Sequence, residues 1–176
     1  MSLAITGAVQ WWRDQQPDPA HKRSGDRAAL ARLRRCATIV EAMQDPATLS
    51  LFRCCGGRSR DDLPFAALAA GVLAHVRAEN AEQPSVARAV GPTSTDEPST
   101  ALMKPLRFRR LMEAETPDER LTAFRRLVAL AGGRVNVRNL AAALLAWNED
   151  LRTRWIYDYW NAGQLTAAPQ AEETST

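Results

Sequence analysis

The chain has 176 residues, 45% of them hydrophobic, and a formal net charge of +3. This size and composition favour one globular domain and exclude an intrinsically disordered protein. No apolar run approaches the roughly 18 residues of a membrane span, and three cysteines are an unsuitable number for a secreted disulfide scaffold.

The predicted elements are helices, because Ala, Leu and Arg dominate and apolar residues recur with helical spacing. The first helix spans residues 2–14. This segment has neither the basic start nor the small-residue cleavage site of a signal peptide, so we expect a cytoplasmic protein. Trp11 and Trp12 are adjacent, so one of them should face away from the buried stripe and is a candidate interface residue. Residues 15–24 contain two prolines and should form a loop.

A second helix is expected to begin after Asp26, which can cap it, and to run to about residue 44. Its core stripe consists of Leu30, Leu33, Ala37 and Val40. A short helix should follow from Pro46, and a mostly apolar helix at 61–76 should run through the core. Residues 79–100 are rich in Pro, Ser, Thr, Glu and Ala without periodicity, which predicts an exposed, mobile loop.

Three start signals mark helices in the second half of the chain. Pro105 begins a helix whose inward residues are Phe108, Leu111 and Met112. Thr116 is a cap followed by proline and two acids, and this helix should end at the glycine pair 132–133. Asn136 can cap a further helix that continues to about Leu151.

These elements together predict an all-α protein, because strand signals are nearly absent. We expect a single helical bundle of about eight helices over residues 1–160. The remaining residues, 161–176, are polar and should form a disordered tail.

Charge is distributed unevenly along the chain. Residues 1–60 hold 10 basic and 5 acidic side chains, residues 61–100 hold 2 and 6, residues 101–160 hold 11 and 7, and the remainder holds 0 and 2. Two basic blocks are therefore separated by an acidic one. Only Lys22 and Lys104 among the 23 cations are lysines. Arginine has a planar fork of donors that suits phosphate groups, although a GC-rich genome would also raise the arginine content.

The sequence contains no catalytic or metal-binding motif that we can identify. There is no Walker loop, no GxSxG and no HExxH, and His21 and His75 lack metal-ligand spacing. We therefore expect no enzymatic activity, no metal and no cofactor. A small thiol enzyme that uses Cys54 or Cys55 remains an alternative, and alkylation of those thiols would test it.

The arginines are the main candidates for function. Residues 107–127 alone contain six, and they occupy positions that the apolar stripes leave at the surface. Nucleic-acid phosphates need only positive donors at loose spacing, and no base-reading motif is present, so we predict binding with little sequence preference. The candidate nucleic-acid-binding residues are Lys22, Arg23, Arg27, Arg34, Arg35, Arg107, Arg110, Arg126, Arg134 and Arg138. The alternative is a solvated face with scattered salt bridges.

Several segments, in order, resemble a known family. They are Trp12, GDRAALARLRR at 25–35, RFRRLMEAE at 107–115, LTAFRRLVALA at 121–131 and VNVRNLAAALLAWNEDLRTRWIYDYW at 135–160. This combination is similar to the CasB family, the small subunit of the type I-E CRISPR Cascade complex. The segment 79–100 and the stretch that begins at Cys54-Cys55 match nothing in that pattern.

The resemblance implies an all-helical, non-catalytic subunit with no membrane association. Such subunits sit as a head-to-tail pair in Cascade, so the implied partners are a second copy of the chain and the backbone and large subunits. Their basic surface contacts crRNA and the target and non-target DNA strands, and stabilises the R-loop. Arg27, Arg34, Arg107 and Arg110 match arginines of the family's motifs. The alternative is a purely structural assembly subunit that binds other subunits through Trp12 and the Trp-rich C-terminal helix.

Overall fold

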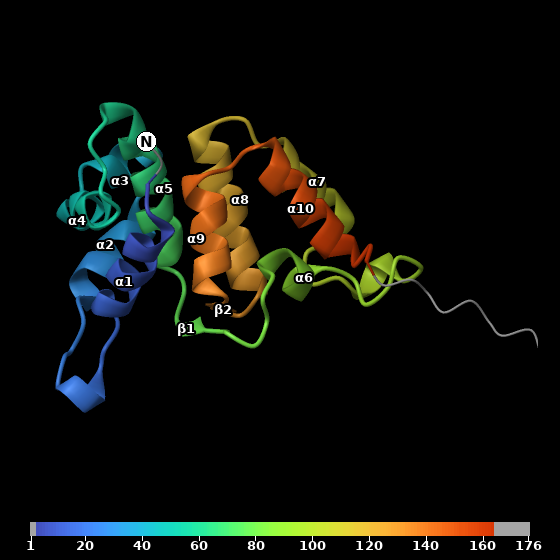
Figure 1. The fold of residues 1–176 in the computed structure, drawn as a ribbon, viewed down its shortest axis with the longest axis horizontal. Coiled ribbons are helices and arrows are strands. Elements are labelled where there is room, and N and C mark those ends of the chain that lie inside the picture. The colour runs from blue at the N-terminus through green and yellow to red at the C-terminus, as the bar shows by residue number, and fades with distance from the viewer. Residues whose placement is uncertain (1–2, 164–176) are drawn as a thin grey trace, which may run out of the picture.

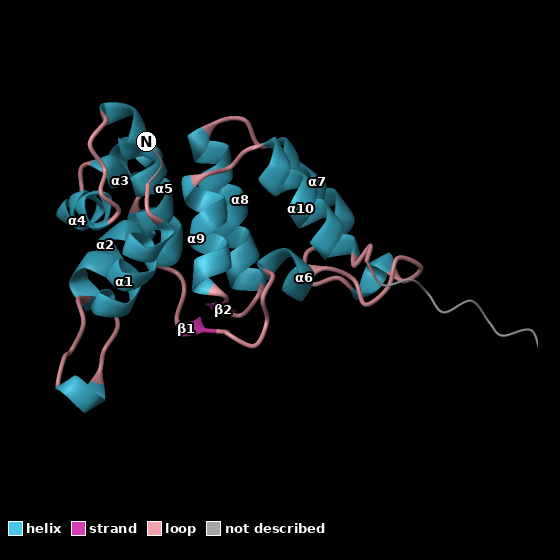
Figure 2. Cartoon of the chain, in the orientation of Figure 1, coloured by secondary structure: helices cyan, strands magenta, loops and turns pink. Residues whose placement is uncertain are grey.

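The computed structural model describes residues 3–163, which form ten α-helices and one short pair of parallel strands (Figures 1 and 2). The helices are α1 Ile5–Gln15, α2 Arg27–Arg35, α3 Ile39–Met43, α4 Pro46–Cys54, α5 Leu63–Leu73, α6 Val86–Val90, α7 Pro105–Glu113, α8 Pro117–Leu130, α9 Val137–Leu145 and α10 Glu149–Trp160. The strands β1 Ala78–Glu79 and β2 Arg134–Val135 pair in parallel, with Ala78 opposite Arg134. Three turns of 3₁₀-helix complete the elements: Pro19–His21, Arg60–Asp62 and Pro98–Thr100. The predicted all-α class is confirmed.

Helix α5 is the central element of the fold. Its residues 66–73 are all buried, as the uniformly apolar sequence predicted, and it contacts α3 and α4 on one side and α8 and α9 on the other. Figure 1 shows α1–α4 gathered toward one end of the long axis and α7 and α10 toward the other, with α5, α8 and α9 between them. The buried apolar side chains form one continuous cluster from Leu3 to Tyr159.

The prediction of one continuous helix from Asp26 to residue 44 is wrong, because this segment forms two helices, α2 and α3. Asp26 does cap α2 and accepts a hydrogen bond from the Ala29 amide. Cys36 then leaves helical geometry at φ −59° and ψ 122°, and Thr38 caps a new helix. As a result Val40, which we assigned to the core, is 61% exposed.

The predicted helix from Asn136 to Leu151 is also two helices. Asn136 caps α9 as expected, and its side chain accepts from the Asn139 amide. The chain leaves the helix at Ala146, and Asn148 caps α10 by accepting from the Leu151 amide. The seven helices placed from the sequence become ten among the described residues, because two of them are divided and α6 is additional.

The segment 79–100 is not the unstructured loop that its composition predicted. It contains β1 at its start and helix α6, whose Val86 and Val90 side chains are buried against the core, and α6 packs on α10. Ser85 also donates a hydrogen bond of 2.7 Å to Asp158 on α10. A five-residue helix is too short to show a helical period, so the sequence pattern could not indicate it.

The prediction that one of the two N-terminal tryptophans faces outward is wrong. Trp11 is 1% exposed and Trp12 is 5% exposed, because α1 lies between α4 and α9. The Trp12 indole nitrogen donates a hydrogen bond of 3.1 Å to the Val76 carbonyl. Trp12 is therefore a core residue and not an interface residue of the described fold.

Helices α7 and α8 agree with their sequence signals. The predicted inward residues of α7, Phe108, Leu111 and Met112, are buried. Thr116 and Glu119 form a complete capping box at the start of α8, and the glycines that end it have positive φ angles. Of the predicted tail 161–176, the part from residue 164 onward lies outside the described residues.

Candidate nucleic-acid interface

The arginines fall into classes according to what their guanidinium groups contact. Five of them donate hydrogen bonds to backbone carbonyls near helix ends: Arg34, Arg88, Arg120, Arg125 and Arg152. Four others pair with carboxylates: Arg23, Arg32, Arg60 and Arg154. Orphan carbonyls at a helix C-terminus need donors and carry a partial negative charge, so arginine suits them. Much of the arginine content is therefore structural.

Among these arginines, Arg125 donates the largest number of hydrogen bonds. Its three nitrogens donate to the carbonyls of Gly71 at 3.1 Å, Cys36 at 2.6 Å and Leu33 at 2.9 Å. Burial lowers the pKa of Arg125 from its ordinary value, because the charged form loses solvation. Because all three nitrogens already donate to carbonyls and the side chain is half-buried, we do not count Arg125 among the phosphate contacts.

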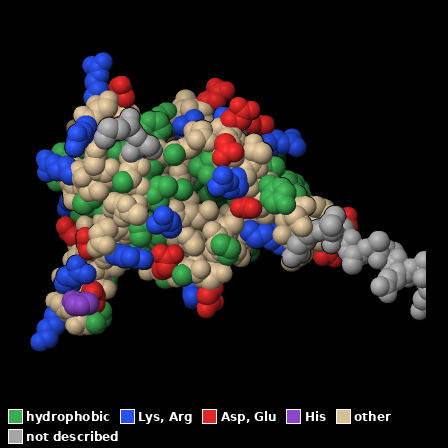
Figure 3. Space-filling model, in the orientation of Figure 1, with side chains coloured by type: hydrophobic (Ala, Val, Ile, Leu, Met, Phe, Trp, Pro, Cys, Tyr) green, Lys and Arg blue, Asp and Glu red, His purple; other side chains and the backbone are tan. Residues whose placement is uncertain are grey.

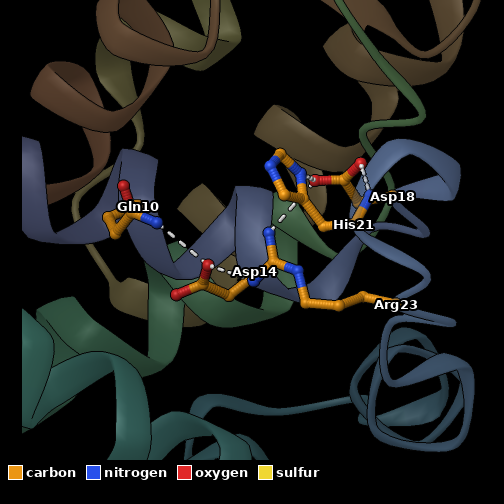
Figure 4. A network of polar contacts seen from close by, with 5 residues as sticks. All are labelled: Gln10, Asp14, Asp18, His21 and Arg23. Carbon is orange, nitrogen blue, oxygen red and sulfur yellow. Dashed lines mark hydrogen bonds and ion pairs between the residues drawn. The ribbon is translucent and has the colours of Figure 1, made fainter.

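Residues 16–25 form an arm that extends from the body between α1 and α2 (Figure 1). Arg23 lies at the base of this arm between two carboxylates, Asp14 at 3.2 Å and Asp18 at 3.3 Å, and Asp18 also contacts His21 at 2.7 Å (Figure 4). The hydrogen bond from His21, with help from Arg23, keeps the pKa of Asp18 below its ordinary value despite its loss of solvation. Arg23 is thus already charge-paired, whereas Lys22 beside it is exposed and its side chain makes no hydrogen bond or ion pair within residues 3–163.

Helix α2 presents three of the predicted residues, Arg27, Arg34 and Arg35, and all three are exposed. The Arg34 side chain is anchored, because its Nε donates to the Ala74 carbonyl at the end of α5 at 2.6 Å. Arg27 and Arg35 have no hydrogen-bond or ion-pair partner in the described part of the chain.

A groove between α7 and α8 brings two further predicted residues together. Its volume is about 550 Å³, and Arg110 from α7 and Arg126 from α8 both line it. Three acidic residues line it as well: Asp118 accepts from the Ile39 amide at 2.7 Å, Glu119 belongs to the capping box, and Glu113 has no side-chain partner within residues 3–163. The groove is therefore mixed in charge. Arg107 is exposed one turn before Arg110 and forms no ion pair with any residue between 3 and 163.

The last two predicted residues lie near the strand pair. Arg134 is exposed in β2, and Arg138 is exposed in the first turn of α9. Arg138 lines a depression of about 390 Å³ together with Arg13 of α1, which sequence reasoning did not select. Glu79 faces the same depression and accepts a hydrogen bond from the Val137 amide at 3.0 Å.

Sequence reasoning also missed a basic cluster around His75. Arg77 and His75 line a pocket of about 270 Å³ with the end of α8. Burial, and then the positive charges of Arg125, Arg34 and Arg77, lower the pKa of His75 to about 4. The only sequence signal was a single arginine two residues after a histidine, which does not stand out in a chain with this composition.

The cysteines show no sign of an activated nucleophile. Burial raises the pKa of the Cys55 thiol to about 11, so it stays protonated at neutral pH. Cys54 is exposed, and no histidine contacts it among the described residues. No three His, Cys, Asp or Glu side chains gather as a metal site within residues 3–163, and no helix there is long and apolar enough to cross a membrane.

A family model for the CRISPR-associated protein Cse2 matches residues 29–160. The chain belongs to the Cse2 family. Cse2 is the CasB small subunit of type I-E Cascade, so the resemblance noted in the sequence is confirmed, and the chain is a Cascade subunit. Family members serve as structural subunits and are generally non-catalytic. No curated protein and no solved structure matches the chain.

The Cse2 match begins after the arm, so it does not cover Lys22, Arg23 or Arg27. The predicted cations of this Cse2 chain also do not form one compact patch. Helix α2 and helix α7 lie toward opposite ends of the long axis, with β2 and the start of α9 between them (Figure 1). On the face drawn in Figure 3, basic side chains are interspersed with acidic ones. The predicted cations therefore lie in three separate groups, on α2 and the arm before it, on β2 and the start of α9, and on α7 and α8.

Proposed function

We propose that this Cascade subunit binds the sugar–phosphate backbone of nucleic acid and thereby stabilises both the crRNA–target pairing and the displaced DNA strand of the R-loop. One observation carries this proposal. Eight of the ten predicted cations are exposed and have no side-chain partner within residues 3–163: Lys22, Arg27, Arg35, Arg107, Arg110, Arg126, Arg134 and Arg138. Nine arginines of the chain donate to carbonyls or pair with carboxylates, while Arg13, Arg53, Arg58, Arg77 and Arg109 are also exposed without a side-chain partner in the described residues.

Separated cationic groups fit an extended polyanion better than a small ligand. A polymer can reach the α2, β2–α9 and α7–α8 groups in turn, whereas no small anion can contact all three. Each neutralised phosphate releases counterions, and that release favours binding without regard to base sequence. Because guided strand exchange is nearly balanced, a modest contribution from such contacts can favour the open R-loop. Sequence specificity comes from base pairing and not from this protein.

The remaining partners follow from membership of Cascade. We propose contacts with the backbone subunits, the large subunit and a second copy of this chain, while crRNA and the target and non-target DNA strands are the nucleic-acid partners. The subunit itself carries out no chemistry in this proposal.

A salt titration tests the backbone contacts. Binding of a labelled single-stranded oligonucleotide should weaken with salt, with a log–log slope near −3.5 if about five phosphates are neutralised. Removal of three uncommitted charges, Arg107→Ala with Arg110→Ala and Arg126→Ala, should make the slope shallower by about 2. Affinity that stays constant from low to high salt would contradict the proposal.

A matched control removes arginines that are already paired. Arg60 and Arg154 are exposed and lie 3.7 Å and 3.2 Å from Asp61 and Asp150. The double change Arg60→Ala with Arg154→Ala should leave the slope unchanged, because these side chains already have an anionic partner. An equal effect per charge removed in both sets of substitutions would mean that net charge alone determines binding.

A purely structural role is the second candidate, and one observation favours it. Four large apolar side chains are exposed on or beside α7 and α10: Leu102, Leu106, Ile156 and Tyr157, with exposures of 43–57%. A groove of about 360 Å³ between these helices has Phe108 and Met112 among its lining residues. If the purified protein retains no labelled DNA or RNA at low salt, this apolar face carries the function of the subunit, and the arginines do not bind nucleic acid.

A further inference from the structure

The chain contains a small pocket that neither the motifs nor the predicted site includes. It lies where the chain leaves α5 and where α8 ends, and we call it the His75 pocket. Six residues line its volume of about 270 Å³: His75, Arg77, Val128, Ala129, Gly132 and Gly133. We propose that this pocket binds one phosphate group, in the complex a phosphodiester of the nucleic-acid strand. This inference deepens the proposed function and rests on it.

The charge around the pocket is positive and has no acidic counterpart. None of the six lining residues is acidic, and Arg77 forms no ion pair within residues 3–163. Arg34 and Arg125 lie close enough to His75 to affect its protonation. Burial lowers the pKa of His75 first, and the three arginines lower it further, to about 4. The arginine charges, which act on His75 after burial, are the part of this environment that an anion would offset.

The nearby arginines differ in what they can offer a phosphate. Each nitrogen of Arg125 already donates to a carbonyl and its side chain does not line the pocket, so we count only its charge. Arg34 uses its Nε on the Ala74 carbonyl, and its two terminal nitrogens make no hydrogen bond within the described residues. Arg77 has its whole guanidinium available. Arg34 does not line the pocket and contributes positive charge from nearby, whereas Arg77 lines it and can turn its guanidinium toward the oxygens of a phosphate.

His75 adds an unpartnered ring nitrogen to this arrangement. Its Nε2 is buried and has no hydrogen-bond partner in the described structure. A buried polar atom without a partner is costly, and most such atoms in folded proteins find one. A bound anion next to the ring would allow the imidazole to donate a hydrogen bond to it.

The helix ends near the pocket do not oppose an anion. The C-termini of α5 and α8 carry partial negative charge, which by itself would repel a phosphate. At α5, however, Arg125 donates to the Gly71 carbonyl and Arg34 donates to the Ala74 carbonyl. At α8, the amides of Gly132 and Gly133 donate to the last carbonyls, Ala129 and Val128. These four carbonyls thus have donors, and the arginine charge remains.

The two glycines keep the pocket open. Both have positive φ angles, 69° at Gly132 and 75° at Gly133, which other residues rarely adopt. A Cβ added at Gly133 would lie 3.4 Å from the Arg77 side chain and 3.5 Å from the His75 carbonyl. A larger residue there would extend toward Arg77 and restrict the space for a ligand.

The experiment uses inorganic phosphate as the first probe and the intact protein in solution. In amide and side-chain NMR spectra, phosphate should produce saturable shifts at Gly132, Gly133 and the Arg77 guanidinium. Arg77→Ala should abolish these shifts. Arg53→Ala is the matched control, because Arg53 is an exposed arginine on α4 with no ion-pair partner in the described chain, and it should leave them unchanged. Shifts that are absent, do not saturate, or survive Arg77→Ala would overturn the inference.

A single-stranded oligonucleotide is the second probe and separates the two proposals. Arg77→Ala should weaken its binding about tenfold at low salt, and Arg53→Ala should change it little. If the oligonucleotide binds with the expected salt slope but the two variants behave alike, the pocket inference fails and the proposed function stands. If phosphate saturates the pocket but no oligonucleotide binds, the pocket takes a free phosphate and the proposed function fails.

Discussion

Arg125 on α8 donates a hydrogen bond of 2.6 Å to the carbonyl of Cys36 at the end of α2, although 89 residues separate them in the chain. The same guanidinium also reaches Leu33 in α2 and Gly71 in α5. One side chain therefore joins three helices and occupies carbonyls that would otherwise be left without donors. In the sequence, Arg125 looks like any other arginine of an arginine-rich helix, yet its role in the fold is structural.

Replacement of Arg125 by methionine should strongly destabilise the fold. Methionine keeps the packing of the stem but leaves three carbonyls without their donor, so we expect the free energy of unfolding to fall by about 3 kcal/mol. Urea denaturation followed by circular dichroism measures this change. The neighbouring substitution Arg126→Met is the control, because Arg126 is exposed, and it should have almost no effect. Equal midpoints for the two variants would show that the Arg125 contacts contribute little.

Arg34 and Arg35 should separate a structural role from a binding role. Arg34→Ala removes the donor for the Ala74 carbonyl and should lower the free energy of unfolding by about 1 kcal/mol, whereas Arg35→Ala should leave stability unchanged. Both substitutions should weaken oligonucleotide binding, because both remove an exposed positive charge. Thermal unfolding and fluorescence anisotropy on the same samples give the two readouts. Loss of stability without loss of binding for Arg34→Ala would remove it from the interface.

His75 should make the stability of the protein depend on pH in a defined window. Its pKa is about 4 in the folded state, against an ordinary value of 6.5, because of burial and the charges of Arg125, Arg34 and Arg77. Between these two values the unfolded chain binds more protons than the folded one. The contribution of His75 to stability is therefore fully present above pH 6.5 and falls as the pH decreases toward 4.

His75→Asn removes that titration and provides the comparison. The difference in unfolding free energy between wild type and variant should change between pH 7 and pH 4.5, with wild type losing more stability on acidification. Urea denaturation at several pH values, in buffers without phosphate, measures both curves. Parallel curves for the two proteins would mean that His75 is not held neutral in the folded state.

Two helical glycines should respond differently to alanine. Alanine usually stabilises a helix interior by about 0.5–1 kcal/mol relative to glycine. A Cβ at Gly7, however, would lie 2.1 Å from the backbone carbonyl oxygen of Cys54, which cannot move without shifting α1 against α4. Gly7→Ala should therefore destabilise the protein by more than 1 kcal/mol.

At Gly71 the nearest atom, at 2.9 Å, is a terminal methyl of Leu121, which can rotate, so Gly71→Ala should change stability much less. Melting temperatures of the two variants that show the opposite order would contradict this reading of α1–α4 packing.

Helix type and several helix starts could be predicted from the sequence because they depend on neighbouring residues. Asp26, Thr116 and Asn136 cap the helices that follow them, as expected, since a cap needs only a side chain and an amide three residues away. The breaks after Arg35 and Leu145 were missed because the residues around them keep a helical period. Local start signals were present, since Thr38 and Glu41 have the spacing of a capping box and Asn148 precedes two acidic residues, but the period alone favoured one continuous helix in each case.

For the candidate site, too, the sequence predicted one part and the tertiary structure decided the other. Composition and spacing indicate which arginines lie outside the apolar stripes, and all ten predicted residues are indeed exposed. Which of them remain available is a tertiary property, because carbonyls and carboxylates brought from distant parts of the chain occupy Arg34 and Arg23. The His75 pocket arises in the same way, where the ends of α5 and α8 meet, 50 residues or more apart in sequence. Local pattern thus determined the helices, the class of protein and the surface charge, while long-range packing decided which charges are free to bind a ligand.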